Sequence, residues 1–343
     1  MLKVTNDFLN EIRVAQGHDM ELQQFIEWLG IDKGKDYQME EDGILCFKGR
    51  VRVPGGPLFR RQILKEGHQS RLSIHPGMTK MYKDLKESFW WNGMKSDVAD
   101  FIAQCLVCQK AKIEHQRPGG TLQPLEIPQW KWDTISMDFV THLSKSTKGH
   151  DSVWVIVDRL TNCAHFLPIN QKWSMDKLVE TYIREVVRLH GVPESIVSDR
   201  DSRFTSRFWQ SLQAALGTQL RMSSAYHPQT DGQSKHTIQS LEDLLRSCVL
   251  DHSGNWNDVL PLVEFTYNNS YHASIGMAPY KALYGRRCKT PLCWHQNGET
   301  LVLGLEFLQQ TTGKVKLIQD RMRATQSRQK SYAARTKLAL HTP

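Results

Sequence analysis

The chain has 343 residues, and at roughly 150 residues per domain this length predicts two or three domains. Hydrophobic residues make up 40% and charged residues 23%, and the mean hydropathy is -0.48, which is typical of a soluble globular protein. A single small module and a chain disordered throughout are both excluded. The longest apolar stretches, such as residues 153–157, are far shorter than the roughly 18 residues that cross a bilayer. Residues 1–10 lack the apolar run of a signal peptide, so we expect an intracellular protein with no membrane partner.

The first 56 residues are predicted to form an N-terminal extension. Residues 7–30 have the periodicity of one or two helices. Residues 44–47 and 51–53 are expected to pair as a β-hairpin around a short turn that contains Gly49.

A small helical domain is predicted over residues 57–113, because apolar residues recur there at spacings of three and four. Its three expected helices cover residues 57–69, 79–89 and 95–104. Residues 114–129 contain several prolines and glycines without a periodic apolar pattern, so we interpret them as a linker.

A mixed sheet with helices packed on it is predicted over residues 130–296. In residues 134–140, Ile135 and Met137 alternate with Ser136 and Asp138, so Asp138 is expected to point away from the apolar face of a strand. Further strands are expected at residues 152–157, 164–169 and 195–198, and helices at 175–187, 208–216 and 234–250. The predicted fold class is therefore α/β multidomain, with a small α-helical domain followed by a mixed-sheet core with flanking helices.

The net charge of +8 is concentrated in a basic helical tail, which is predicted over residues 297–343. From residue 314 onward there are eight basic residues and one acidic residue, Asp320. Such a tail favours a polyanionic partner, most often nucleic acid, although a solvated charged helix explains the pattern equally well. The candidate DNA-binding residues are Lys314, Lys316, Arg321, Arg323, Arg328 and Lys330.

Two histidines and two cysteines in the small helical domain have the pattern of a zinc site. Six residues lie between His68 and His75, and 29 residues lie between His75 and the C-x-x-C of Cys105 and Cys108. Two imidazoles and two thiolates make the closed tetrahedral set that Zn²⁺ prefers, and a domain with a thin core needs such a site. The alternatives are surface histidines beside a chance cysteine pair, or a redox motif. The redox alternative is weaker because no strand leads into the C-x-x-C.

Asp138 and Asp199 are acidic residues near strand ends, which a sheet can bring together although they are far apart in the sequence. Neighbouring carboxylates repel each other unless cations bind between them, and two such groups with a third would hold two Mg²⁺ ions for displacement at phosphorus. The spacing does not exclude Asp201 or Asp231 from this role. Each aspartate could equally be a turn or cap residue.

Several motifs together resemble the integrase of plant gypsy-class LTR retrotransposons. They are His68 with Ser73-Ile74-His75-Pro76-Gly77, Phe89-Trp90-Trp91, Cys105-Leu-Val-Cys108, Ser136-Met-Asp138-Phe, Ile196-Val-Ser-Asp199-Arg-Asp-Ser-Arg-Phe, and Ala225-Tyr-His-Pro-Gln-Thr-Asp-Gly-Gln-Ser234. The resemblance covers essentially the whole chain. It implies an HHCC zinc domain and a ribonuclease-H-like core with an Asp, Asp, Glu triad, of which Asp138 and Asp199, not Asp201, are the first two members.

The resemblance also implies the reaction and its setting. Water first attacks phosphodiesters at the ends of the element, and the freed 3'-hydroxyls then attack target DNA. Zn²⁺ is expected as a structural ion and Mg²⁺ or Mn²⁺ as the catalytic ion, held by Asp138 and Asp199. The implied partners are double-stranded DNA and further copies of the chain, and the implied location is the nucleus.

The chain departs from the family pattern at Lys235, which stands where the family has the catalytic Glu, with 35 residues between it and Asp199. At an effective dielectric near 20, a unit charge pair at about 4 Å is worth roughly 4 kcal/mol, so a cation there weakens metal binding by several kcal/mol. Glu242 lies seven residues further on, about 10.5 Å along a helix, and cannot substitute. We therefore expect impaired catalysis. Family members also continue into a β-barrel and sometimes a chromodomain, which we expect this chain to lack.

Two functions of different classes remain open from the sequence. One is a polynucleotidyl transferase, active or recently inactivated, and the other is a non-catalytic DNA-binding or multimerising protein, as a decayed copy or one kept by the host. Lys235 favours the second for this chain, whereas the other site residues favour the first for its origin. A zinc-finger regulator that recognises a base sequence has little support, because no recognition-helix pattern is visible.

Overall fold

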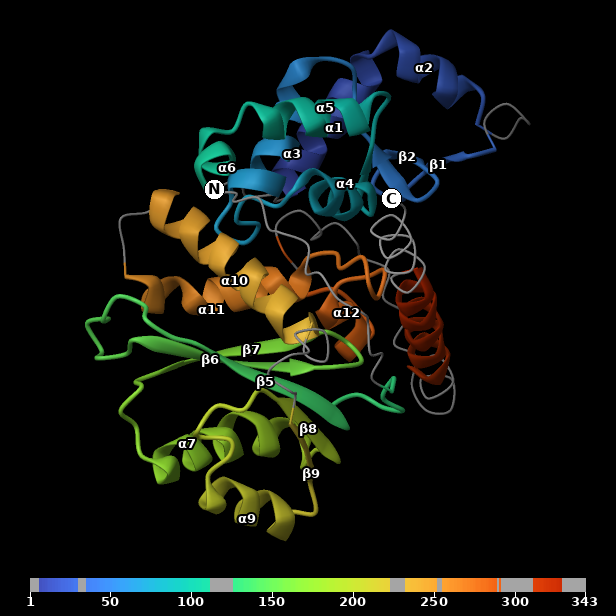
Figure 1. The fold of residues 1–343 in the computed structure, drawn as a ribbon. Helices are drawn as coiled ribbons and strands as arrows, with labels where there is room; N and C mark the ends of the chain where they lie inside the picture. The colour runs from blue at the N-terminus through green and yellow to red at the C-terminus, as the bar shows by residue number, and fades with distance from the viewer. Residues whose placement is uncertain are drawn as a thin grey trace, which may run out of the picture. The chain divides into compact units, whose positions relative to one another are not determined.

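The structure is a computed structural model that describes residues 6–29, 35–111, 126–222, 232–251, 255–288, 290 and 311–328. The chain divides into two compact units (Figure 1). The first unit comprises Met1–Lys112 with Cys288–Val302, and the second comprises Ile113–Arg287 with Leu303–Pro343. Each unit has a hydrophobic core of its own.

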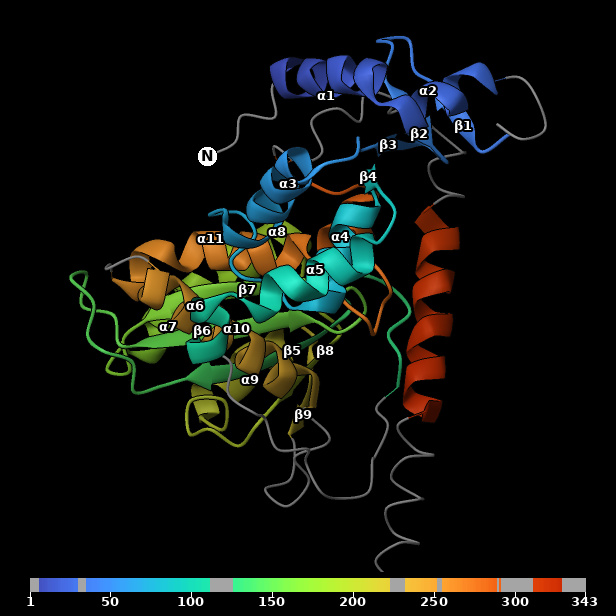
Figure 2. The ribbon, with the colours of Figure 1, turned by 90° about the horizontal axis from the view of Figure 1, so that it is seen from above.

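The first unit combines short helices with a small sheet (Figures 1 and 2). Its helices are α1 (Asn6–His18), α2 (Met20–Glu27), α3 (Pro57–Gln69), α4 (Met78–Lys86), α5 (Met94–Ala103) and α6 (Leu106–Ala111). Its strands are β1 (Tyr37–Met39), β2 (Leu45–Phe47), β3 (Arg50–Arg52) and β4 (Phe89–Trp90), in the order β1-β2-β3-β4. The predicted helices in residues 7–30 and the predicted hairpin around Gly49 are thus confirmed.

One hydrophobic core joins the segments of this unit. It contains Ile12 of α1, Val51 of β3, Ile63 of α3, Phe89 of β4 and Val98 of α5, each at most 3% exposed. The expected N-terminal extension and the expected small helical domain therefore fold around a shared core.

The predicted helix over residues 79–89 is wrong at its C-terminal end. α4 ends at Lys86, and Phe89 and Trp90 form β4, which pairs in parallel with β3 through the partners Val51 with Phe89 and Arg52 with Trp90. Aromatic residues suit a pleated surface. The partner strand lies far back in the sequence, so helical periodicity gave no sign of this pairing.

The second unit is built on a five-stranded mixed sheet. Its strands are β5 (Thr134–Val140), β6 (Ser152–Asp158), β7 (Ala164–Ile169), β8 (Ser195–Ser198) and β9 (Gln219–Met222), in the order β7-β6-β5-β8-β9. β7, β6 and β5 are antiparallel neighbours, whereas β8 and β9 run parallel to β5. The sequence pattern did not predict β9, which is short and only partly buried.

Helices cover both faces of this sheet (Figure 1). They are α7 (Met175–Tyr182), which continues through the π-helix η2 (Ile183–Val187) into α8 (Arg188–His190), α9 (Arg207–Ala215), α10 (Gly232–Asp251), α11 (Trp256–Asn269) and α12 (Pro279–Tyr284). Ile135 and Met137 of β5 share a core with Tyr182 of α7 and Trp209 of α9. α10 packs against β5 and β6 on the opposite face. The predicted mixed-sheet core with flanking helices is confirmed.

The edge strand β7 is closed by side chains of α11. The backbone N–H of Ala164 donates to Asn268 Oδ1 at 2.9 Å, and Asn268 Nδ2 donates back to the Ala164 carbonyl at 2.8 Å. The N–H of Phe166 donates to Glu264 Oε2 at 2.7 Å. These side chains satisfy backbone groups that would otherwise offer a pairing edge to another strand.

A helix over residues 311–328 packs on the second unit rather than standing apart from it (red in Figures 1 and 2). Its residues Val315 and Ile318 are buried in a cluster with Leu160, Ile275 and Ala282. The predicted helical character of this part of the tail is confirmed. A freely solvated helix does not describe it, because one side is part of a core.

Candidate functional site

His68, His75, Cys105 and Cys108 are brought together from the end of α3, the loop after it and the segment from the end of α5 into α6. His68 lies in the last turn of α3, Cys105 lies between α5 and α6, and Cys108 lies in α6. His75 is carried by the loop after α3, where its N–H donates to the carbonyl of His68 at 2.8 Å. Ile74 and His75 have φ angles of +42° and +47°. This left-handed backbone is unfavourable for a β-branched residue such as Ile74, and it returns the imidazole of His75 toward His68.

The four potential ligand atoms have the spacing of a tetrahedral zinc site. His75 Nδ1 lies 3.3 Å from His68 Nε2 and 3.3 Å from Cys105 Sγ, and Cys108 Sγ lies 3.3 Å from His68 Nε2 and 3.8 Å from His75 Nδ1. Zn–N bonds near 2.05 Å and Zn–S bonds near 2.3 Å give tetrahedral edges of about 3.3 Å between two nitrogens and about 3.6 Å between nitrogen and sulfur. All four side chains are buried. The residues therefore fit Zn²⁺ in donor type, spacing and enclosure.

The sheet register places Asp138 and Asp199 side by side. In the parallel pair of β5 and β8, Met137 is the partner of Ser198, and the two aspartates are the next residues on their strands. Adjacent strands lie about 4.8 Å apart, so the two carboxylates share one edge of the sheet. Asp138 alternates with the core residue Met137, as the sequence predicted, and projects on the face that α10 covers.

Burial disfavours the charged forms of both carboxylates, and repulsion from neighbouring aspartates adds to its effect. Burial raises the pKa of Asp138 from 3.8 to about 6. The N–H of Phe139, which donates to the carboxylate at 2.7 Å, acts to lower this pKa. The negative charge of Asp199 acts to raise it further. Burial also raises the pKa of Asp199, opposed by a hydrogen bond from the N–H of Asp201 at 3.1 Å. Two partly buried carboxylates that resist ionisation together are the arrangement that a divalent cation relieves.

Asp201 is engaged elsewhere. Arg203 donates to its two carboxylate oxygens at 2.8 and 2.6 Å, and the guanidinium lies 3.5 Å from the ring centroid of Phe139. Although burial acts to raise the pKa of Asp201, the hydrogen bonds and charge of Arg203 outweigh it and lower the pKa. This geometry favours Asp199 over Asp201 as the partner of Asp138. Asp231, the other alternative, lies outside the described residues.

Sequence reasoning missed the role of Arg203 and Phe139. The guanidinium joins the loop after β8 to β5, because it forms the ion pair with Asp201 while it stacks on Phe139. The loop that begins at Asp199 is thereby tied to the strand that carries Asp138. An arginine two residues after an aspartate was the only signal in the sequence, and it is too common to identify such a clamp.

Lys235 lies in the first turn of α10, the helix that packs on the Asp138 face of the sheet. Its positive charge lowers the pKa of Asp138 and of Asp199, although burial raises both by more. Among the described residues, no salt bridge joins Lys235 to either aspartate, and its side chain is exposed. Glu242 is part-buried on the same helix, seven residues further on.

Two cations of the basic tail bond to carbonyls outside the tail, whereas others are exposed on its helix. Lys314 Nζ donates to the carbonyl of Gly285 at 2.9 Å, and Arg321 Nη1 donates to the carbonyl of Gly276 at 2.7 Å. A Cβ at Gly276 would meet Arg321 Nη1 at 1.8 Å, so this approach requires glycine. These two predicted DNA-binding residues therefore have structural partners in the core. Of the other candidates, Lys316, Arg323 and Arg328 are exposed, and Lys330 lies outside the described residues.

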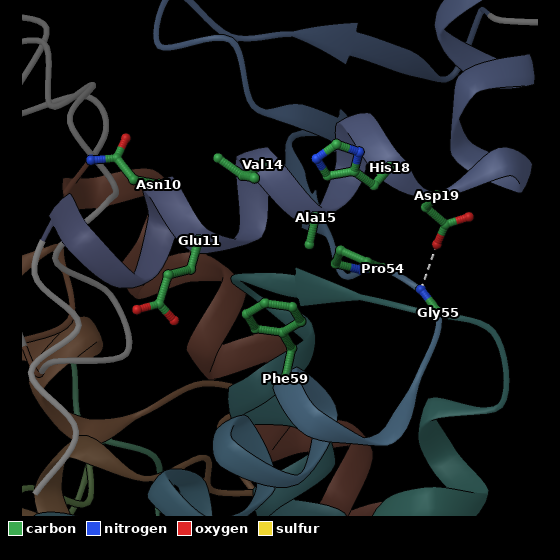
Figure 3. A pocket seen from close by; sticks show the side chains of 9 residues that line it. All are labelled: Asn10, Glu11, Val14, Ala15, His18, Asp19, Pro54, Gly55 and Phe59. Carbon is green, nitrogen blue, oxygen red and sulfur yellow. Dashed lines mark hydrogen bonds between the residues drawn. The ribbon is translucent and has the colours of Figure 1, made fainter.

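The first unit also has an open groove of about 820 Å³ beside α1 (Figure 3). Phe59 points into it from α3 and Val14 from α1, and Asp19 accepts a hydrogen bond from the N–H of Gly55 at 2.6 Å. The lining includes Glu11 and His18 but none of the predicted zinc or carboxylate residues.

We expect Cys108→Ser to abolish stoichiometric zinc binding and to lower the melting temperature, because a hydroxyl replaces one of four ligands at a site that joins three helices. Elemental analysis of the purified chain measures the zinc directly. Cys46→Ala is the matched control, since Cys46 is a buried cysteine of the same unit outside the cluster. Equal zinc content in the parent and Cys108→Ser would contradict the assignment.

We expect Asp138→Asn to stabilise the chain in the absence of divalent cations, and more so at high pH. A carboxyl whose pKa rises from 3.8 to about 6 on folding binds its proton more tightly in the folded state, so stability falls as pH rises through that window. The gain should grow from about 1.5 kcal/mol at pH 5 to about 3 kcal/mol at pH 8. Urea unfolding measures it, with the exposed Asp176→Asn as control. A gain independent of pH would contradict the electrostatic cause.

In the part of the chain that the structure describes, no helix is both long and apolar enough to span a membrane. The protein has similarity to known families on two segments. The integrase zinc binding domain matches residues 57–114, and the integrase core domain matches residues 128–228.

The chain is 29% identical over 289 residues to the Transposon Tf2-3 polyprotein of Schizosaccharomyces pombe, and to the same extent to the Tf2-4 polyprotein of that organism. The match covers 82% of this chain and 21% of the polyprotein, so the chain spans about a fifth of the length of these relatives.

The chain is also similar to solved structures. The simian T-cell lymphotropic virus intasome in complex with PP2A regulatory subunit B56 gamma aligns over 61% of this chain and 73% of its own, with 15% identity and a TM-score of 0.41. The HTLV-2 integrase catalytic core domain in complex with magnesium aligns over 45% and 97%, with 15% identity and a TM-score of 0.37. The predicted resemblance to an integrase is confirmed by the two family models: a segment that matches the integrase zinc binding domain is followed by one that matches the integrase core domain, and the five-stranded mixed sheet lies within the second segment.

Proposed function

We propose that the chain is a retrotransposon integrase of the gypsy class, a polynucleotidyl transferase that acts on phosphodiesters of double-stranded DNA at element ends and in target DNA. The observation that carries this proposal is the in-register pair of Asp138 and Asp199 at one edge of the sheet of an integrase core domain. Similarity to the Tf2 polyproteins supports the retrotransposon origin. DNA as the partner would place the protein in the nucleus, and we propose that it acts there as a homo-oligomer.

We propose that His68, His75, Cys105 and Cys108 hold a structural Zn²⁺ within a domain over residues 57–113, and that Asp138 and Asp199 hold Mg²⁺ or Mn²⁺ in a core over residues 130–296. The catalytic ion, when bound, supplies charge stabilisation for in-line displacement at phosphorus. Asp138 and Asp199 would bind it through carboxylate oxygens, for which both must be ionised. Arg203 keeps Asp201 out of this set and fixes the loop that carries Asp199.

We propose further that Lys235 impairs this chemistry. It supplies a positive charge near both aspartates from the helix position where the third carboxylate is expected. A cation there favours ionised carboxylates without metal, and it opposes a second positive ion at the same place. The site then has two carboxylates and an ammonium group instead of three carboxylates that repel one another.

The second candidate function is a DNA-binding or multimerising protein without catalysis, retained by the host or left by a decayed element. Lys235 is the observation in its favour, since it removes a ligand without disturbing the fold around Asp138 and Asp199. The exposed Lys316, Arg323 and Arg328 offer phosphate contacts that do not require the carboxylates.

We expect Lys235→Glu to restore strand transfer on element-end DNA with Mg²⁺ or Mn²⁺, while the unmodified chain shows little or none. Lys235→Glu should also lower the melting temperature without metal, because a third carboxylate joins the buried pair. Lys235→Gln is the matched control, because it removes the cation without supplying an ionised ligand. Strong transfer by the unmodified chain would contradict the proposed impairment. Failure of Lys235→Glu to transfer, despite bound metal, would contradict the proposed enzyme activity of this chain.

We expect salt-sensitive DNA binding in which the exposed side of the tail helix takes part. Replacing Lys316, Arg323 and Arg328 by Gln should make the slope of log K against log salt shallower by up to about 0.9 per lost phosphate contact on duplex DNA. These substitutions spare the buried Val315 and Ile318, which truncation of the tail would remove. A slope equal to that of the parent would show that the exposed cations are only solvated.

A further inference from the structure

Two histidines of the second unit meet at the edge of the mixed sheet. His165 lies on the edge strand β7 and His190 is the last residue of α8, and their Nε2 atoms are 2.9 Å apart. The ring centroids are 5.2 Å apart, so the rings meet nearly end to end through these two nitrogens. Trp132 lies flat on His190, with ring centroids 3.6 Å apart and an angle of 3° between the planes. The contact therefore joins the end of the α7–α8 helix to the sheet.

A carboxylate of α11 decides which ring nitrogen carries the proton. His165 Nδ1 lies 3.1 Å from Glu264 Oε1, and the other oxygen of Glu264 accepts the N–H of Phe166 at 2.7 Å. Because an ionised carboxylate only accepts hydrogen bonds, His165 Nδ1 is the donor, and Nε2 of the neutral imidazole is then an acceptor. His190 Nε2 must therefore donate the bond between the rings. The hydrogen bonds run in one direction, from His190 through His165 to Glu264.

This geometry accepts one positive charge on the two rings but not two. A further proton can bind His190 Nδ1 and leave the bond between the rings intact. When both imidazoles are charged, each Nε2 carries a hydrogen, and two N–H groups then face each other at 2.9 Å, where neither has an acceptor. Burial lowers the pKa of His190 from 6.5 to about 4, and the charge of His165 acts in the same direction. The closed contact thus binds fewer protons than two separated histidines.

Other charged groups lie on the elements around the pair. They are Glu264 of α11, Arg188 of α8, Asp158 of β6, and Asp133 and Glu194 in the segments before β5 and β8. Asp158 accepts from the backbone N–H of Trp132 at 3.0 Å, and Arg188 donates to the carbonyl of Arg184 at 2.9 Å. Burial raises the pKa of Asp133, and the charge of Glu194 adds to this. Glu264 is the carboxylate that bonds to the pair, and its single charge balances one proton but not two.

The contact holds a part of the helix that has little support of its own. α8 comprises only Arg188–His190 and directly follows the π-helix η2. The last turn of a helix frays unless side chains hold it. Beyond α8 the chain turns at Gly191, whose φ is +87°, and continues into β8. The bond between the histidines and the stacking on Trp132 thus fix the segment that leads into β8.

We propose that His165, His190 and Glu264 form a pH-sensitive switch between α8 and β7, which is closed while the two rings carry at most one charge and opens when both are protonated. The open state binds the proton that the closed state excludes. The contact is therefore fully stable above the ordinary histidine pKa of about 6.5, and below it the open state gains about tenfold per pH unit. The switch uses neither the zinc ligands nor Asp138 and Asp199, so its test is independent of the proposed function.

Hydrogen exchange of the full chain with its zinc tests the switch. Mass spectrometry compares peptides over residues 188–192 at pH 7.5 and pH 5.5, after correction for the intrinsic exchange rate, and peptides of β6 report global unfolding. We expect the protection of the α8 peptides to fall about tenfold at the lower pH in the parent chain, and that of β6 to fall less.

Three variants separate the titration from the packing. His190→Gln removes the titrating ring and keeps an N–H donor near the position of Nε2, so protection of the α8 peptides should change by less than about twofold between the two pH values. His165→Asn keeps a donor for Glu264 but removes the acceptor for His190, so protection should be low at both pH values. The exposed His142→Gln is the matched control and should behave as the parent does.

Zinc content is measured at both pH values, so that loss of the zinc site is not mistaken for opening of α8. If His165→Asn fails to fold by circular dichroism, the comparison of the parent with His190→Gln still decides the question. Equal protection of the α8 peptides at both pH values in the parent would overturn the inference, and so would an unchanged pH response in His190→Gln. A second zinc ion per chain that His190→Gln removes would overturn it as well, because a metal ion rather than a proton would then join the rings.

Discussion

The parallel pairing of β5 with β8 is the constraint on which the core depends. It sets Asp138 beside Asp199 by backbone register alone, and the helices that cover the sheet then raise the pKa of both carboxyls through burial. Folding therefore places two like charges where they disfavour each other. The surrounding structure limits this cost locally: the N–H of Phe139 donates to Asp138, the N–H of Asp201 donates to Asp199, and Arg203 forms an ion pair with Asp201, the third carboxylate near this edge. The negative charge of Asp138 and Asp199 that these contacts leave unbalanced at the edge of the sheet is suited to a divalent cation.

Lys235 adds a positive charge that acts on both aspartates at this edge of the sheet. Three clustered carboxylates repel one another without a metal ion and are stabilised when one binds. Two carboxylates with a nearby ammonium are stabilised without a metal ion and oppose its binding. The exposed Lys235 acts at a distance rather than through a salt bridge within the described residues, so its effect on the aspartates is smaller than that of their burial. A side-chain cation that stabilises the metal-free site opposes metal binding there, which is the usual trade-off between stability and function at active sites.

Local patterns in the sequence predicted the parts of the structure that are themselves local. Period-two alternation identified the face of Asp138, and the spacing of His68, His75, Cys105 and Cys108 predicted the residues that the structure brings within 4.8 Å of one another. The missed features depend on partners distant in sequence. β4 exists because β3 pairs with it, and Arg203 matters because Phe139 lies under its guanidinium. The residues next to β4 and Arg203 have no periodic pattern that would reveal these partners. Likewise, the assignment of Lys235 to the third triad position rests on motif spacing rather than on physical chemistry.

Net charge illustrates the same distinction between composition and structure. Residues 314–343 hold a net charge of 8 − 1 = +7, nearly all of the excess positive charge, yet Lys314 and Arg321 direct theirs at backbone carbonyls of the core, and Arg323 pairs with Asp320 at 3.0 Å. Buried Val315 and Ile318 orient the helix so that Lys316, Arg323 and Arg328 are left toward solvent. A cation that is fixed against a carbonyl still contributes to the long-range field that attracts DNA, but it cannot follow a phosphate without giving up its hydrogen bond. The packing of two apolar side chains thus decides which cations of the tail are available to close contacts.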